Sequence, residues 1–331
     1  MRIGVVIEET WTFFQEIYEE LQRAHPTSLY RRRSLHLPLF EARLNNFLFH
    51  RDLKGFLEGN QVVFFEWASD LLSYASQLPK TCGMVTRLHR YELNQFAERI
   101  NWEHVDKVIL VSQAKKREFI RRFPTQEQKI VVIPEAISLS KFTPLRREFN
   151  GDLGILCNLT PRKRVYELIL AFYELQTQRS GYHLHIGGGR HERFGDYYQA
   201  IHDMVERLGL QNQVTLYGRV TDPQQWYRGV DIFISNSYSE GLQVSPMEAI
   251  ASGCYCLSHN WDGAGELLPG ESRYDTDRQL IEKIFNYADS SSQGRQAMWE
   301  EQYAIVGERF DIDRTKVAIR QLVEEAGAAW Q

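Results

Sequence analysis

Residues 230–253 read VDIFISNSYSEGLQVSPMEAIASG, and this stretch indicates the fold of the chain around it. Its first six residues form a short apolar run, which predicts a buried strand. The second half predicts a helix that begins between Leu242 and Pro246. Ligands of doubly wound α/β sheets bind beyond the carboxyl ends of strands. We therefore expect a ligand-binding loop between this strand and this helix.

Two carboxylates flank the predicted start of the helix. Glu240 and Glu248 are separated by seven residues, so one precedes the helix and the other lies on its first turns. A helix N-terminus has unpaired N–H groups and the positive end of the helix dipole, which make it an anion site. A ligand with a central diphosphate and a hydroxyl-rich sugar at each end would meet complementary groups here. The alternative is that two glutamates merely flank a surface helix.

The stretch resembles the Glu-seven-residues-Glu motif of the retaining glycosyltransferases of family 4, also called group 1 glycosyltransferases. The resemblance extends over most of the chain and implies an α/β fold of the GT-B type, with two doubly wound Rossmann-like domains facing a central cleft. It implies that Glu248 binds the ribose of a nucleotide and that Glu240, as a catalytic residue, contacts the donor sugar. The donor-binding backbone groups that it implies are those of Gly241, Leu242, Gln243 and Val244. Gln243 replaces a glycine of the family, so we expect its side chain to crowd or read the sugar.

Strand and helix patterns alternate along the chain, which predicts parallel sheets with crossover helices. The predicted strands are 2–7, 61–65, 82–86, 105–111 and 129–133, then 152–157, 182–186, 213–217, 231–235 and 254–258. Residues 134–151 lack periodicity and contain two prolines, so we place a linker there. We expect an acceptor-side domain at 1–148, completed by a C-terminal helix at 312–331, and a nucleotide-sugar domain at 149–311. Residues 293–328 are predicted to be helical.

A second loop of the predicted nucleotide domain carries three consecutive cations, Arg162, Lys163 and Arg164, between a strand and a helix. Cations are disfavoured at a helix start unless an anion is present, so they favour a diphosphate over simple solvation of the helix. The loop resembles the family's phosphate-binding loop. That resemblance implies a catalytic role for Lys163 and donor contacts for Arg162 and Asn158, although Asn158 stands where the family has an arginine.

Two further segments resemble donor-contacting parts of the family. Gly218, Arg219 and Val220 follow the strand 213–217, where the family packs its backbone on the nucleobase. Glycine permits that close approach, and an ordinary turn is the alternative. His89 follows the strand 82–86 and resembles the family's histidine that faces the donor sugar. We expect it to be catalytic, with a structural histidine as the alternative.

The first domain departs from the family in two loops. The family's first glycine-rich loop is replaced by Glu8, Glu9, Thr10 and Trp11. Carboxylates are poor diphosphate ligands, so we expect this loop to face the acceptor. Trp11 is interpreted either as a ring that stacks on a sugar or as a core side chain. After the strand 129–133 the chain reads Pro-Glu-Ala at 134–136, where the family has Pro-Asn-Gly.

Composition narrows the possible functions. The 331 residues are 43% hydrophobic and 25% charged, as in ordinary globular proteins, and no apolar run is long enough to predict a membrane span. Residues 1–150 carry 22 Lys and Arg against 18 Asp and Glu, whereas the rest carries 17 against 25. Basic clusters at 31–33, 115–117 and 121–122 favour an anionic lipid or acceptor, with solvated helix faces as the alternative. Nucleic acid is not expected, because no basic-aromatic pattern occurs.

The chain is expected to be cytoplasmic, with a peripheral contact at the inner membrane face left open. Its four cysteines suit a reducing compartment, and we predict Cys254 and Cys256 to be buried core thiols. A strand begins at residue 2, so no secretory signal peptide is expected. Asp-x-Asp sequences at 275–277 and 311–313 lie outside the predicted cleft. We therefore expect neither a metal nor a cofactor.

Together these features predict a metal-independent, retaining glycosyltransferase of the hexosyltransferase type, acting in polysaccharide or glycoconjugate biosynthesis. The expected donor is a UDP- or GDP-sugar, and the expected acceptor is a saccharide or a lipid-linked molecule. Two alternatives stay open: a GT-B epimerase or glycogen-type synthase, and a sugar-nucleotide-binding protein without catalysis.

Overall fold

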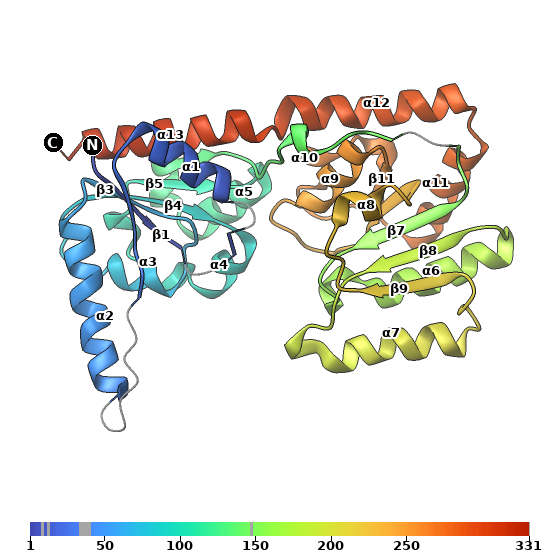
Figure 1. Cartoon of the computed structure of the whole chain (residues 1–331), viewed down its shortest axis with the longest axis horizontal. Coiled ribbons are helices and arrows are strands. Elements are labelled where there is room, and N and C mark those ends of the chain that lie inside the picture. The colour runs from blue at the N-terminus through green and yellow to red at the C-terminus, as the bar shows by residue number, and fades with distance from the viewer. Residues whose placement is uncertain (8–9, 12–13, 33–40, 146–147, 331) are drawn as a thin grey trace. The chain divides into compact units, whose positions relative to one another are not determined.

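The computed structural model describes residues 1–7, 10–11, 14–32, 41–145 and 148–330, except the side chains of 41–44 and 46–47. The chain separates into two compact units. Unit 1 is Met1–Glu135 with Ile312–Gln331, and unit 2 is Ala136–Asp311. In each unit a parallel sheet lies between layers of helices (Figure 1). The predicted α/β class is therefore confirmed.

Unit 1 contains a six-stranded parallel sheet in the order β2-β1-β3-β4-β5-β6. Its strands are β1 (Ile3–Val6), β2 (Thr27–Leu29), β3 (Val62–Phe65), β4 (Gly83–Leu88), β5 (Lys107–Leu110) and β6 (Ile130–Val132). All residues of β1, β3 and β4 are buried, as expected for strands with helices on both faces. The sequence pattern misses β2, because this edge strand has three residues and begins with polar Thr27 and Ser28.

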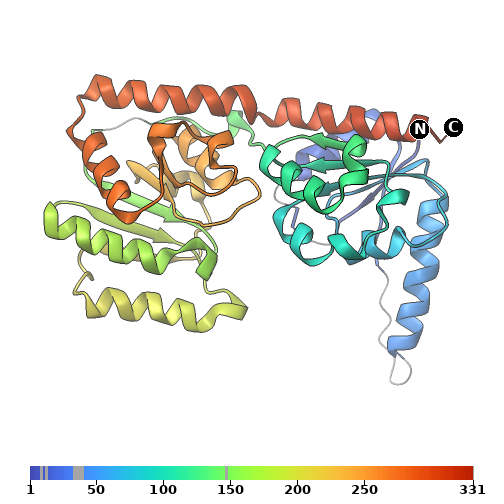
Figure 2. The same ribbon diagram turned by 180° about the vertical axis from the view of Figure 1, so that it is seen from behind.

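Helices cover both faces of this sheet (Figure 2). They are α1 (Gln15–Ala24), α2 (Glu41–Glu58), α3 (Asp70–Ala75), α4 (Arg90–Gln95), α5 (Gln113–Arg122) and α13 (Ile312–Ala328). On one face Phe65 belongs to a hydrophobic cluster with Leu72 of α3 and Phe119 of α5. On the other, α13 packs against α1, β3 and β4. Ser112 caps α5, because its hydroxyl accepts from the N–H of Lys115 at 3.2 Å.

Unit 2 contains a second six-stranded parallel sheet, in the order β12-β11-β10-β7-β8-β9. Its strands are β7 (Asp152–Leu156), β8 (His183–Gly187), β9 (Val214–Gly218), β10 (Ile232–Ser235), β11 (Tyr255–His259) and β12 (Arg273–Tyr274). The first five coincide with predicted strands, and β12 is a two-residue addition at the edge. From β7 the chain moves outward to β8 and β9, then returns to place β10 on the other side of β7. This reversal is a topological switch point, where doubly wound sheets bind ligands.

The helices of unit 2 also pack on both faces of their sheet. They are α6 (Val165–Gln178), α7 (Gly195–Arg207), α8 (Pro223–Tyr227), α9 (Val244–Ser252), α10 (Ala264–Leu267), α11 (Asp277–Asp289) and α12 (Ser292–Arg309). Side chains of α6, α7 and α11 form one hydrophobic cluster with the sheet, and those of α8, α9 and α12 form another. Cys254 and Cys256 are buried in the second cluster, which confirms the prediction of core thiols.

The helical stretch predicted at 293–328 is interrupted between α12 and α13. Phe310 leaves the helical conformation, with φ −124° and ψ 34°, and its side chain is buried. Its carbonyl accepts from the N–H of Ile137 at 2.9 Å, so it pairs with the segment that enters unit 2 and the helix stops. None of the described helices is both long enough and apolar enough to cross a membrane.

Candidate active site

The loops that follow β7 and β10 leave unit 2 at its switch point. β7 and β10 are parallel neighbours, with Leu153 opposite Ile232, so their carboxyl ends lie at the same edge of the sheet. The first loop ends in a 3-10 turn, Pro161–Lys163, before α6. The second loop ends at Gln243, the N-cap of α9. Sheet topology thus joins two segments that are distant in sequence.

Three side chains of these loops converge on one oxygen of Glu240. Oε1 of Glu240 lies 2.7 Å from Nζ of Lys163 and 3.0 Å from Nε2 of Gln243. The same oxygen forms an ion pair with Nη1 of Arg162. Arg162 also donates to the carbonyl of Ser239 at 2.8 Å, which fixes its position on the second loop. Glu240 is only 7% exposed, so these interactions are shielded from water.

The charges in this cluster favour an anionic ligand. Burial alone would raise the pKa of Glu240, but Lys163 and Arg162 outweigh that effect and hold the pKa below its ordinary value. Glu240 is therefore ionised at neutral pH, and two cations share one carboxylate. The remaining positive charge lies beside the start of α9, whose first N–H groups have no partner within the helix. Such an arrangement can hold a diphosphate.

The side chain of Gln243 supports Glu240 from inside the loop. Gln243 is 6% exposed, and its Nε2 also donates to Oγ of Ser237 at 3.2 Å. Its Oε1 accepts from the hydroxyl of Ser235. The amide group is thus bonded to the last residue of β10 and to two side chains of the loop. The structure shows Gln243 holding Glu240, and the expectation that its side chain crowds or reads a sugar stays a prediction.

An unusual backbone conformation fixes the course of the first loop. Arg164 has a φ of 51°, in the left-handed region, and no other non-glycine residue has a positive φ in the described part of the chain. Its carbonyl accepts from Nδ2 of Asn236 at 2.9 Å, and Oδ1 of Asn236 accepts from the hydroxyl of Tyr274 at 2.8 Å. Such backbone costs about 1–3 kcal/mol and is typical of binding sites. These bonds tie the loop of the cations to the loop of Glu240.

Glu248 lies on α9 and is supported by a residue that the sequence analysis misses. Its Oε2 accepts from the hydroxyl of Tyr227 at 3.1 Å. Burial raises the pKa of Glu248 to about 6, and the bond from Tyr227 opposes this shift only in part. Tyr227 is fully buried at the end of α8. Its role depends on the packing of α8 on α9, which no local sequence signal reveals.

The other predicted donor-binding residues lie at the same edge of the sheet. Asn158 is exposed in the loop after β7. Gly218 ends β9, two strands away from β7, with a φ of 65° that favours glycine. After it, Arg219 is exposed and Val220 packs against the cluster of α8 and α9. Of the predicted residues, Arg162, Lys163 and Gln243 contact Glu240 directly.

In unit 1, His89 lies at the end of β4 within a buried charged network. Its Nδ1 is 2.8 Å from Oε1 of Glu135, and its ring stacks on Trp67 with the ring centres 4.2 Å apart. Arg87 is fully buried and pairs with both Glu66 and Glu135. His89 is the only one of these residues that the sequence pattern indicates as functional, because arginine is seldom buried. The one available signal is Glu135, where the chain departs from the family.

The predicted acceptor-side loop is described only in part. Glu8 and Glu9 lie outside the described residues. Thr10 is exposed. Trp11 packs edge-on against Tyr18 of α1, with the ring centres 5.4 Å apart. Trp11 is half-buried in this contact, and both interpretations of its ring stay predictions.

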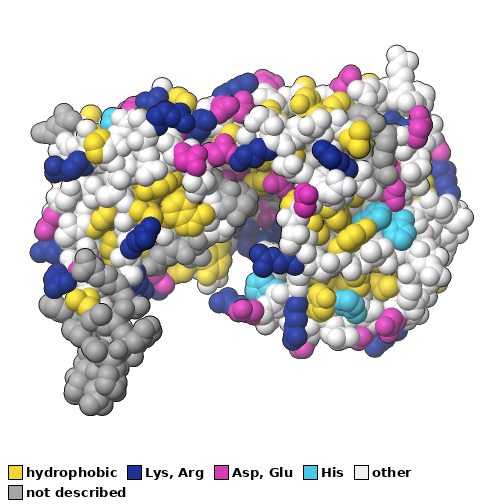
Figure 3. All heavy atoms as spheres, viewed as in Figure 1, with side chains coloured by type: hydrophobic (Ala, Val, Ile, Leu, Met, Phe, Trp, Pro, Cys, Tyr) yellow, Lys and Arg dark blue, Asp and Glu magenta, His cyan; other side chains and the backbone are white. Residues whose placement is uncertain are grey.

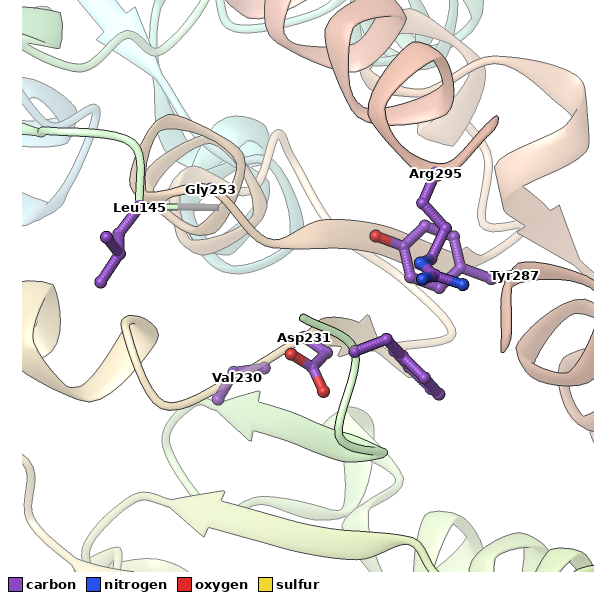
Figure 4. A pocket seen from close by; sticks show the side chains of 7 residues that line it. Leu145, Val230, Asp231, Gly253, Tyr287 and Arg295 are labelled. Carbon is purple, nitrogen blue, oxygen red and sulfur yellow. The ribbon is translucent and has the colours of Figure 1, made fainter. Parts of the chain in front are cut away.

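A small cavity of unit 2 lies near the amino ends of β7, β10 and β11, away from the loops at their carboxyl ends (Figure 4). It is lined by Leu145, Phe149, Val230, Asp231, Gly253, Tyr287 and Arg295 and has a volume of about 10 Å³. Asp231 accepts from the N–H groups of Asn150 and Asp152 at 2.8 and 3.0 Å, so its carboxylate already binds the backbone. The cavity is no larger than one water molecule and is not a candidate active site. Among the described residues, no three His, Cys, Asp or Glu side chains are arranged to hold a metal ion.

Comparisons with known proteins find similarity to glycosyltransferases. Residues 150–285 match the family model of the group 1 glycosyl transferases. The chain is 26% identical over 239 residues to the GtfA subunit of the UDP-N-acetylglucosamine–peptide N-acetylglucosaminyltransferase of Streptococcus gordonii, covering 68% of this chain and 46% of that protein. It is 25% identical over 172 residues to the alpha-monoglucosyldiacylglycerol synthase of Streptococcus pneumoniae, covering 47% and 37%. The chain thus spans less than half the length of these curated relatives.

Solved structures share the fold along nearly the whole chain. Anabaena Alr3699/HepE in complex with UDP covers 98% of this chain and 99% of its own, at 15% identity and a TM-score of 0.77. A glycosyltransferase from Rickettsia africae covers 98% of both chains, at 15% identity and a TM-score of 0.76. The predicted GT-B fold is confirmed. The chain thus has the GT-B fold, and its residues 150–285 are similar to the group 1 glycosyl transferases. Membership of family 4 in particular stays a prediction.

Proposed function

We propose that this chain transfers a sugar from a nucleotide-sugar donor to a saccharide or lipid-linked acceptor, with retention of the anomeric configuration and without a metal ion. The observation that carries the proposal is the cluster in which Arg162 and Lys163 meet Glu240 beside the start of α9. Two similar proteins favour a uridine nucleotide. HepE was crystallised with UDP, and the S. gordonii protein is named for UDP-N-acetylglucosamine. We therefore propose a UDP-sugar as the first donor to test.

The roles of the residues follow from their charges. Lys163 and Arg162 hold the diphosphate, and Glu248 accepts hydrogen bonds from the ribose hydroxyls. When the bond between the anomeric carbon and the diphosphate oxygen breaks, negative charge grows on the diphosphate. The two cations and the N–H groups of α9 stabilise that charge. The acceptor oxygen bonds to the same face of the sugar, and its proton passes to the departing diphosphate. Once Lys163 and Arg162 bind the diphosphate, the carboxylate of Glu240 is free to accept a hydrogen bond from a hydroxyl of the donor sugar.

We place the acceptor on unit 1 and propose a peripheral contact of this unit with an anionic membrane. Part of its basic charge is neutralised internally, since Lys115 lies 2.5 Å from Glu118 and Arg122 lies 2.8 Å from Glu98. On the face shown in Figure 3, basic side chains are interspersed with acidic ones. The membrane contact therefore depends on other cations, of which Arg31 is exposed.

The proposal is tested with the purified chain and a panel of UDP- and GDP-sugars. Thermal shift identifies the donor that binds. Mass spectrometry then detects sugar transfer to saccharide and lipid-linked acceptors, with and without a chelator, and NMR of the product gives its anomeric configuration. We expect a retained configuration and activity that survives the chelator.

Each alternative has its own result in this assay. Conversion of the donor without acceptor identifies an epimerase, and binding without turnover identifies a non-catalytic protein. Activity lost in chelator and restored by magnesium or manganese contradicts metal independence. An inverted product contradicts retention.

A further inference from the structure

Five ionisable side chains gather at the carboxyl ends of β3, β4 and β6 in unit 1. They are Glu66, Arg87, His89, Glu92 and Glu135. Glu66, Arg87 and Glu92 are fully buried, and Glu135 is 4% exposed. β3 and β4 are parallel neighbours, so Glu66 after β3 and His89 after β4 share one edge of the sheet. Charged groups are rarely this deep unless they are paired.

Each carboxylate oxygen of Glu135 contacts a different partner. Its Oε2 lies 3.4 Å from Nη1 of Arg87, and its Oε1 lies 2.8 Å from Nδ1 of His89. Glu66 holds the other side of both groups. Its Oε1 accepts from Nε of Arg87 at 3.0 Å and lies 3.7 Å from Nε2 of His89. The stack on Trp67, with the rings inclined by 28°, fixes the plane of the imidazole.

The charges balance only when His89 carries a proton on both nitrogens. Ionised Glu66 and Glu135 supply two negative charges, and Arg87 supplies one positive charge. A buried excess of charge is costly, so a second cation is favoured among these residues. Glu92 does not disturb this balance below neutral pH, because burial raises the pKa of its carboxyl to about 7, against the opposing effect of His89.

We infer that Glu135 and Glu66 hold His89 as an imidazolium and that His89 serves sugar transfer as a charged hydrogen-bond donor through Nε2–H, not as a general base. Glu135 and Glu66 are positioning residues in this inference, which rests on the function proposed above. Nε2 of His89 lies 3.7 Å from Oε1 of Glu66, which is beyond hydrogen-bond distance, and neither it nor the buried Nε1 of Trp67 makes a hydrogen bond within the described part of the chain. Two N–H groups on stacked rings are thus left for oxygens of a ligand. A fixed positive charge there suits an oxygen on which negative charge develops.

The electrostatics of His89 agree with this geometry. Burial lowers the pKa of its imidazole, but Glu135 and Glu92 outweigh burial, and the pKa is raised to about 10. A histidine with such a pKa already carries both ring protons at neutral pH and cannot accept a further one as a base. Glu135 stands where the resembling family has a neutral asparagine, so the charged state is a property of this chain's own loop.

The inference is tested by NMR of the ¹⁵N-labelled imidazoles of the whole chain between about pH 5.5 and 10. The His89 signals are assigned by their loss in His89→Gln. We expect His89 to stay doubly protonated up to about pH 9, and Glu135→Gln to lower its pKa by at least about one unit. Glu135→Asp should restore part of the shift. The matched control is Glu98→Gln, whose carboxylate pairs with Arg122 at the surface of the same unit.

His183 of unit 2 gives a reference in the same spectra, since burial and the neighbouring His185 lower its pKa. An unaltered His89 that loses a proton below about pH 7.5 overturns the inference even if Glu135→Gln does not fold. An unchanged His89 in folded Glu135→Gln also overturns it. In the transfer assay, the alkaline limb of kcat/KM should move to lower pH in Glu135→Gln and not in Glu98→Gln. The NMR titration needs no substrate, so failure of the proposed function is recognised separately.

Discussion

Nζ of Lys163 lies 2.7 Å from Oε1 of Glu240, although 77 positions separate the two residues in sequence. Their side chains are 13% and 9% exposed, so the ion pair is largely shielded from solvent. The pair joins the loop after β7 to the loop after β10. It also engages the cation that an incoming diphosphate needs. An anion that binds here must therefore compete with Glu240.

Glu240→Gln removes that competition. We expect UDP to bind about threefold to tenfold more tightly, because a charge interaction of about 1 kcal/mol no longer opposes it. Sugar transfer should fall, because Glu240 no longer contacts the donor sugar as a carboxylate. Calorimetry with UDP and the transfer assay measure the two effects. Glu282→Gln, which removes a carboxylate on the exposed side of α11, is the control. Weaker binding of UDP in Glu240→Gln contradicts the competition.

Lys163→Ala should reduce kcat more than it reduces binding of the nucleoside. The lysine acts on charge that grows in the transition state, and loss of one such group costs about 10²–10³ in kcat. Arg278→Ala, whose side chain is 89% exposed in the same unit, should leave kcat unchanged. Steady-state kinetics and uridine binding separate the two effects. Equal turnover in Lys163→Ala and the parent chain removes Lys163 from the mechanism.

Binding of uridine should depend on pH through Glu248. Burial raises the pKa of this carboxyl to about 6, so it is protonated below that pH and ionised above it. If the ionised form accepts from the ribose, affinity rises as the pH passes upward through about 6 and then levels off. Uridine is the suitable probe, because the diphosphate of UDP titrates in the same range. In Glu248→Gln the affinity should be weaker and independent of pH over this range. A pH dependence that persists in Glu248→Gln assigns it to another group.

Replacement of Arg31, Arg32 and Arg33 by serine should weaken binding to anionic vesicles. Each basic residue near such a surface contributes about 1 kcal/mol, and salt screens the attraction. Cosedimentation at low and high salt measures the difference, with neutral vesicles as the control. No binding of the parent chain at low salt contradicts the membrane contact and favours a soluble acceptor.

The sequence predicts the strands well where burial is complete. β3 and β10 are largely apolar runs because helices cover both faces of their sheets, and these runs are visible in the sequence. β2 and β12 are missed, because they are short edge strands with polar residues. The break at Phe310 carries no glycine or proline signal, since it depends on the bond from Ile137, a residue far away in sequence.

The sequence predicts the loops of the candidate site one by one, but it does not predict that they meet. The motif locates Glu240 and the basic loop locates Lys163, but their contact depends on the strand order that places β7 beside β10. Tyr227 is missed for a similar reason, because its bond to Glu248 requires α8 to pack on α9. Local patterns do not contain this information. The network around Arg87 is missed because a charged residue inside a strand is normally read as exposed.

Arg87→Met should be strongly destabilising. The substitution keeps much of the side-chain volume but leaves Glu66 and Glu135 as buried carboxylates without the guanidinium. Removal of one partner from a buried charge pair costs about 3–5 kcal/mol. The control is Arg99→Met, since Arg99 and its partner Asp70 are 55% and 76% exposed, and such pairs contribute about 0–1 kcal/mol. Urea unfolding followed by circular dichroism gives the free energy of unfolding.

The pH dependence of the stability lost in Arg87→Met provides a second check on the role of Arg87. Burial raises the pKa of Glu135, but Arg87 and His89 outweigh it and lower the pKa to about 2. A lowered carboxyl pKa stabilises the fold at pH values above the ordinary glutamate pKa, and this stability is lost as the pH falls toward about 2. The parent chain should therefore lose stability below about pH 4.5, where unfolded glutamate takes up protons. Arg87→Met should lose less over the same interval, because its Glu135 gains little from ionisation. Parallel losses in both proteins contradict the role of Arg87 in holding the Glu135 carboxylate.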